Sequence, residues 1–156
     1  MRLLCMKSMR TEQTSVEMED SLERFLDGQR FGYDFALEEV KNGEKTSHWI
    51  WYVFPQMRGL GHSPNSIFYG IASLEEAKAY ASHPVLGMRL REVTEALLGH
   101  KGKSPEEILG GIDALKVRSC MTLFDKVCPD DIYAMVLDAF YGGERCRRTL
   151  NMIGDE

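Results

Sequence analysis

Two helix-start signals of the same kind constrain the fold of this chain more than any other sequence feature. At residues 73–76 and again at 104–107, a serine is followed three residues later by a glutamate. Such a pair satisfies the free backbone N–H groups at a helix N-terminus. Pro105, directly after the second serine, fits the first helical position, where its missing N–H needs no partner. The sequence therefore predicts helices that begin after Ser73 and after Ser104.

Apolar residues recur at helical spacing along most of the chain. Leu86, Leu90, Val93 and Leu97 form one such stripe, because spacings of three and four residues place side chains on one face of an α-helix. Similar stripes occupy residues 22–40, 117–128, 132–140 and 146–153, with breaks expected at Gly28 with Gly32, Asn42-Gly43, Gly99, Pro129 and Gly142-Gly143. We therefore predict an all-α fold, a single compact domain of about seven to nine short and medium helices.

The expected domain spans residues 20–156, preceded by a flexible N-terminal tail at residues 1–19. The tail is polar and lacks an apolar period, and 156 residues suit one domain. A secretory signal is not expected, since the apolar run from Leu3 to Met6 is followed at once by Lys7. No apolar run approaches the roughly 20 residues that span a bilayer, so we expect no membrane association and a cytoplasmic location.

Composition and charge exclude some functions. The chain is 44% hydrophobic and 28% charged, as in folded globular proteins, and its net charge is −5. We do not expect nucleic-acid binding from a chain without a net basic balance, since such binding depends on a basic face. The four cysteines, Cys5, Cys120, Cys128 and Cys146, follow no zinc-ligand spacing. We interpret them as reduced thiols, predict no metal site, and find no motif that identifies a cofactor.

The most unusual stretch is residues 45–64, which holds both tryptophans of the chain. Ser47 and His48 stand beside Trp49, Trp51, Tyr52 and Phe54, and a loop between Pro55 and Pro64 follows. The aromatic content favours a strand, but no second strand-like run exists to pair with it, so we predict a short helix that Pro55 ends. We expect this stretch to be the hub of the fold and the wall of any site.

Charged residues on stripes that should be apolar give a second clue. Arg89 points with the buried face of its helix, and Asp113 and Lys116 lie on or beside the stripe of theirs. Two interpretations are open. Asp113 and Lys116 would form a local ion pair while Arg89 extends to the surface, or Arg89 and Lys116 would hold an anion in a pocket with Asp113 orienting one of them.

Several motifs in the same order resemble one known family. They include 45–56, 59–61, 69–71, 83–87, 89–90 and 113–124, and the resemblance covers roughly residues 22–150. The chain resembles the bacterial family called domain of unknown function 1810, which implies a single, mainly α-helical domain and implies no function. Cys120 and Cys146 stand where that family's pattern has a serine and an acidic residue.

These observations predict a domain that binds a small anionic ligand, nucleotide-like or a phosphorylated metabolite, with His48 as a candidate catalytic acid or base. The ligand-binding candidates are Ser47, Trp49, Trp51, Gln56, Tyr69, His83, Arg89, Asp113, Lys116 and Ser119. The alternative is a non-catalytic helical protein-interaction module. Its docking surface would be the loop between Pro55 and Pro64, where Gln56 and Arg58 would contact the partner.

Overall fold

The computed structural model describes residues 12–154, with side chains from Asp20 onward. Within this part of the chain it contains helices and no strand, so the predicted all-α fold is confirmed. The helices are α1 (Glu12–Asn42), α2 (Ile50–Val53), α3 (Pro64–Phe68), α4 (Leu74–Ser82), α5 (Leu86–Leu98), α6 (Pro105–Leu109), α7 (Gly111–Val127), α8 (Ile132–Tyr141) and α9 (Arg147–Met152). Of the predicted tail, residues 1–11 lie outside the described part, whereas residues 12–19 belong to α1.

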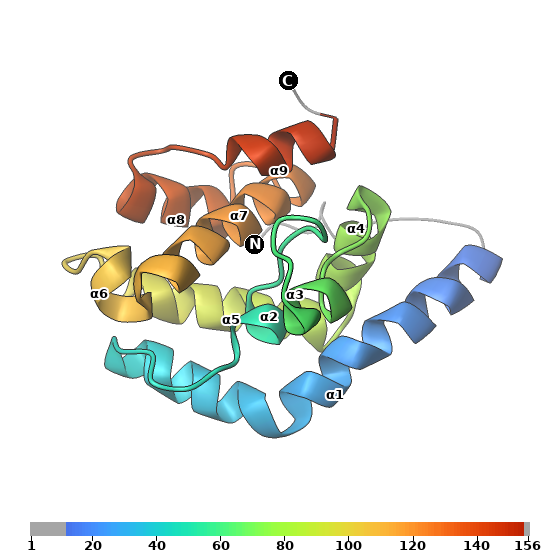
Figure 1. Cartoon of the computed structure of the whole chain (residues 1–156), viewed down its shortest axis with the longest axis horizontal. Coiled ribbons are helices and arrows are strands. Elements are labelled where there is room, and N and C mark those ends of the chain that lie inside the picture. Colours follow the sequence, from blue (N-terminus) through green and yellow to red (C-terminus); the bar gives the residue numbers. More distant parts are fainter. Residues whose placement is uncertain (1–11, 155–156) are drawn as a thin grey trace.

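Helix α5 lies at the centre of the molecule. It packs against α1 on one side and against α4 and α8 on the others, and α7 packs against α4, α6 and α8. Figure 1 shows α1 along one side of the molecule and α7, α8 and α9 along the opposite side. The apolar stripe predicted from Leu86 to Leu97 is buried between them. None of the described helices is long and apolar enough to cross a membrane.

The predicted break at Gly28 and Gly32 is wrong, because α1 runs without interruption from Glu12 to Asn42. Figure 1 shows that the helix changes direction near its middle. The two glycines make room for a tyrosine of α2. A Cβ at Gly28 would lie 2.9 Å from Cγ of Tyr52, and one at Gly32 would lie 2.3 Å from its hydroxyl oxygen. These glycines therefore serve helix packing, and they do not end a helix.

Both serine helix starts are confirmed, but their glutamates differ. Ser104 accepts a hydrogen bond from the backbone N–H of Glu107, and Glu107 accepts one from Ser104 N, so this capping box is complete. Ser73 likewise accepts from the N–H of Glu76. The Glu76 carboxylate, however, accepts from Ala72 N and pairs with Arg24 of α1. The Glu76 carboxylate thus pairs with a distant cation, and the predicted hydrogen bond from Ser73 N to Glu76 is replaced.

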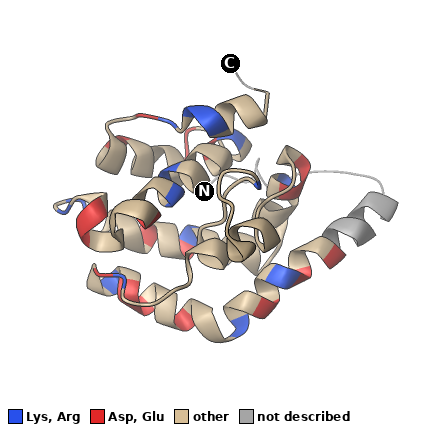
Figure 2. Ribbon diagram, viewed as in Figure 1, with Lys and Arg blue, Asp and Glu red and all other residues tan. Residues whose placement is uncertain are grey.

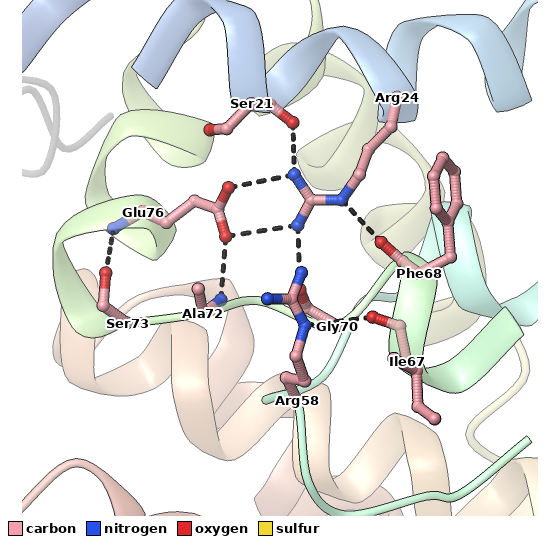
Figure 3. Close-up of polar contacts among 9 residues, drawn as sticks. All are labelled: Ser21, Arg24, Arg58, Ile67, Phe68, Gly70, Ala72, Ser73 and Glu76. Atoms are coloured by element: carbon pink, nitrogen blue, oxygen red, sulfur yellow. Dashed lines mark hydrogen bonds and ion pairs between the residues drawn. The ribbon is translucent and has the colours of Figure 1, made fainter. Parts of the chain in front are cut away.

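Arg24 connects α1 to the segment between α3 and α4. Its guanidinium donates to the carbonyls of Phe68 and Gly70, each at 2.8 Å, and lies 3.0 Å from a carboxylate oxygen of Glu76 (Figure 3). The Arg24 side chain is 12% exposed and that of Glu76 4%. Removing either charge would leave the other buried and unpaired, which is strongly destabilising. This cluster fixes α3 and α4 against the long helix.

The tryptophan-rich stretch forms the short helix α2, as predicted. Trp49 and Phe54, which flank it, are each 1% exposed and belong to the core. After Pro55 the chain forms two backbone hydrogen bonds with the segment after α3. Arg58 N donates to Ile71 O at 2.8 Å, and Ile71 N donates to Gln56 O at 2.9 Å. These bonds hold Gln56 in place at the edge of the site described below.

Candidate functional site

Ser47 and Trp49 contact a carboxylate that the sequence did not single out. Glu39 of α1 accepts hydrogen bonds from Thr46 N, from Ser47 N and Oγ, and from Trp49 Nε1, at 2.5–3.0 Å. Burial raises the pKa of Glu39, but these hydrogen bonds outweigh it and lower the pKa to about 2. The polar groups of Ser47 and Trp49 therefore hold the turn before α2 against α1.

The two histidines among the candidates lie outside any common site. His48 is exposed and lines neither of the two pockets described below. His83 precedes α5, where its Nδ1 accepts from the backbone N–H groups of Val85 and Leu86 at 3.1 and 3.2 Å. His83 thus caps the start of α5, in the role that serine has at α4 and α6.

Arg89 lies at the contact between α5 and α1. Its Nη1 donates to the side-chain oxygen of Gln29 at 3.2 Å, and its guanidinium lies 5.1 Å from the centre of the Tyr33 ring. Arg89 lines neither pocket with Lys116. The structure therefore does not bring Arg89 and Lys116 to one anion.

Asp113 is held by two cations at the start of α7. Lys45 lies 2.9 Å from one of its carboxylate oxygens, and Lys116 lies 3.8 Å from the other. The local ion pair between Asp113 and Lys116, which was one of the two interpretations of the sequence, is therefore present. The shorter contact comes from Lys45, which is 68 positions away and which spacing along one helix does not indicate. Because Lys45 already pairs with Asp113, Lys116 is only loosely held by this carboxylate.

A narrow pocket brings four of the candidates together. Trp51, Gln56, Tyr69 and Lys116 line a space of about 10 Å³, which is room for one water-sized group. The indole N–H of Trp51 is buried and has no hydrogen-bond partner. The Lys116 ammonium lies 5.5 Å from the centre of the Trp51 ring.

A larger groove of about 270 Å³ adjoins it and shares Gln56 and Lys116 with it. The groove lies between the loop after α2, one face of α7 and the start of α9. Three cations line it, namely Lys116 and Arg118 of α7 and Arg148 of α9. Figure 2 shows the basic positions of α7 and α9 in the same half of the molecule, with acidic positions spread over most other helices.

The charges around the groove are unbalanced. None of the described residues that line it is acidic. Arg118 reaches Glu144 only at 3.5 Å, and the Glu144 side chain is 76% exposed, so solvent screens this pair. The Nε of Arg118 is buried and has no hydrogen-bond partner. Arg148 donates a long hydrogen bond of 3.4 Å to Gly59 O. The groove therefore offers donors and positive charge to a ligand.

The rest of the lining contains both polar and apolar side chains. Ser119 and Cys146 lie together, with Ser119 Oγ 3.3 Å from Cys146 Sγ. Ile112 and Leu115 contribute apolar surface at the rim, and they are 73% and 56% exposed. A ligand with a charged group and a carbon skeleton would match both parts.

The structure thus gathers five of the ten ligand-binding candidates around the two pockets, namely Trp51, Gln56, Tyr69, Lys116 and Ser119. Sequence reasoning missed Arg118, Arg148 and Cys146. The basic run at residues 145–148 is visible in the sequence, but it indicates only an exposed cluster on a helix. Arg148 lines the groove with residues of α7 because α9 packs on α7, which spacing along the chain does not reveal. Within the described residues no group of three or more His, Cys, Asp or Glu side chains is placed to hold a metal ion.

The fold and the groove define a small all-helical domain with a basic surface groove. The chain belongs to the family described as Protein of unknown function (DUF1810), whose pattern matches residues 19–153, and this confirms the resemblance seen in the sequence. It is also similar to the conserved hypothetical protein Rv1873 from Mycobacterium tuberculosis, known from a crystal structure. The two are 44% identical with a TM-score of 0.84, and the match covers 86% of this chain and 97% of that one. No curated protein matches the chain.

Proposed function

We propose that this protein binds a small anionic ligand, nucleotide-like or a phosphorylated metabolite, in the groove between α7, α9 and the loop after α2. The observation that carries the proposal is the convergence of Lys116, Arg118 and Arg148 on one groove that no described acidic residue lines. Arginine is well suited to phosphate and carboxylate groups because its fixed fork of N–H donors matches their oxygens.

Size and polarity narrow the ligand class. A space of about 270 Å³ lies just below the range of drug-sized pockets, about 300–1,000 Å³, and suits a compact metabolite. The apolar rim at Ile112 and Leu115 would cover its carbon skeleton. The same exposed side chains are the main support for the alternative, a protein-interaction module. We favour the ligand because the alternative leaves the three convergent cations unexplained.

Binding is tested by thermal unfolding in the presence of pyrophosphate, AMP and a sugar phosphate, each compared with sodium chloride at equal ionic strength. A ligand that binds only the folded state stabilises it by about 2.7 kcal/mol at 100 times its Kd. We expect at least one phosphate compound to raise the melting temperature of the protein. Arg118→Met and Arg148→Met should each remove most of that rise.

Arg147→Met is the matched control, because Arg147 neighbours Arg148 in the chain and is exposed like it, but does not line the groove. It should keep the full rise. An equal rise in all three variants would place the anion elsewhere and contradict the proposal. So would a melting temperature that follows ionic strength alone.

A further inference from the structure

Among the described residues that line the groove, Cys146 is the one cysteine. Its side chain lines the groove together with Lys116, Arg118 and Arg148, although the residue is only 7% exposed. The other two described cysteines differ from it: Cys120 is fully buried, Cys128 is 3% exposed, and neither lines the groove. A reagent that reaches Cys146 from the groove is therefore in a space that the three cations also line.

The surroundings of Cys146 favour the thiolate, which is the reactive form. Burial raises the pKa of the Cys146 thiol, but the hydrogen bond from Ser119, the backbone N–H of Thr149 and the charge of Arg118 outweigh it, so the pKa lies below its ordinary value. Thr122 Oγ1 accepts a hydrogen bond from Cys146 N at 3.0 Å, which fixes the backbone at this point. Burial alone acts on Cys120 and raises its pKa well above the ordinary value.

We propose that Cys146 is a thiol-modification site that exchanges with small anionic disulfides, of the size and charge of glutathione disulfide, held by the cations of the groove. This inference rests on the proposed function, since the same three cations would select the reagent. The carboxylates of one half of the disulfide would lie against Lys116 and Arg148. That placement brings the sulfur atoms toward the end of the groove where Cys146 lies next to Ser119.

The reaction is a thiol–disulfide exchange. The Cys146 thiolate attacks one sulfur of the disulfide, so a new S–S bond forms and the original S–S bond breaks. The electron pair leaves with the second sulfur as a thiolate, which takes a proton from water. Cys146 is thereby oxidised to a mixed disulfide, and the reagent is reduced to one free thiol. No other oxidant is needed.

The test compares two disulfides of opposite charge on the reduced full-length protein. Glutathione disulfide is anionic and cystamine is cationic, and the modified positions are mapped by mass spectrometry of peptides. We expect Cys146 to react with glutathione disulfide at least about ten times faster than with cystamine after correction for the intrinsic rates of the two reagents, because a positive cleft concentrates anions. Cys120 and Cys128 should stay unmodified, and Cys5 is scored separately.

The ratio of the corrected rates with glutathione disulfide and cystamine at Cys146 should fall toward one in Arg148→Met and stay unchanged in Arg147→Met. Equal corrected rates for the two reagents, or modification of Cys5 alone, would overturn the proposal. The outcome is separable from the proposed function. Anion-induced stabilisation that persists in Cys146→Ser, with no adduct at Cys146 in the natural protein, refutes the thiol site and leaves anion binding intact. A charge-selective adduct without any stabilisation by phosphate compounds supports the thiol site and refutes the phosphate ligand.

Discussion

The indole N–H of Trp49 donates to the carboxylate of Glu39 at 2.8 Å, and this bond joins the aromatic stretch to the long helix α1. Glu39 accepts three further hydrogen bonds, from Thr46 N and from Ser47 N and Oγ. Because its carboxylate accepts four hydrogen bonds, the negative charge of Glu39 contributes to the stability of the fold.

Glu39→Gln should destabilise the protein by about 2 kcal/mol, because hydrogen bonds to a charged acceptor are worth about 1.5–3 kcal/mol and the amide presents N–H groups to donors. The loss should also change the acid response. The folded-state pKa of about 2 is below the ordinary 4.5, so the stabilisation is full above pH 4.5 and disappears as the pH falls toward 2. Urea unfolding between pH 2 and pH 7 should show the unfolding free energies of the two proteins converging in acid.

Glu38→Gln, at an exposed neighbour, is the control, and a constant difference across this pH range would contradict the assignment.

Arg24→Met should cost about 3–5 kcal/mol, since it leaves the carboxylate of Glu76 buried without its cation. The control is Arg30→Met on the same helix, where the arginine is 63% exposed and its pair with Asp27 contributes little. Denaturant unfolding of Arg24→Met, Glu76→Gln and the double variant measures the coupling between the two residues. Additive losses would show that the ion pair does not stabilise the fold.

Gly87→Ala should destabilise the protein by about 1–3 kcal/mol, as overpacked substitutions do, although alanine is the better helix former. A Cβ at this position of α5 would lie 2.2 Å from the carbonyl oxygen of Ala81, which is backbone and cannot rotate away. Gly111→Ala in α7 is the matched control, because nothing lies within 4 Å of its Cβ position. Thermal unfolding that ranks Gly87→Ala at or above the natural protein would show that α4 and α5 move apart without cost.

The fold was predictable where its signals are local. The capping serines, the glycine at Gly43 and the stripe of α5 each act within a few residues, and all appear in the structure as expected. The errors concern contacts between distant residues. The sequence predicts a helix end at Gly28 because it does not show that Tyr52 of another helix packs on this glycine.

The candidate site divides in the same way. Lys116 was found because it stands beside a stripe whose period is visible, whereas Gln56 and Ser119 became candidates through the resemblance to the family. Arg89 was predicted to lie with Lys116 in one pocket, but it lines neither pocket. A charge on an apolar face indicates that a partner is needed, and it does not indicate which residue is the partner. Its partner is Gln29, which lies 60 positions earlier in the chain. Arg118 and Arg148 become neighbours only when α9 folds back on α7.

The arginine that ties α1 to the α3–α4 segment makes two of its bonds to main-chain carbonyls, those of Phe68 and Gly70. Every residue type carries a carbonyl, so position 68 can change its side chain freely without loosening this connection. Correlated substitutions among relatives should therefore reveal the contact between Arg24 and Glu76. They should not reveal the contact between Arg24 and residue 68. An essential contact of the fold would in this way escape any method that infers proximity from correlated substitution.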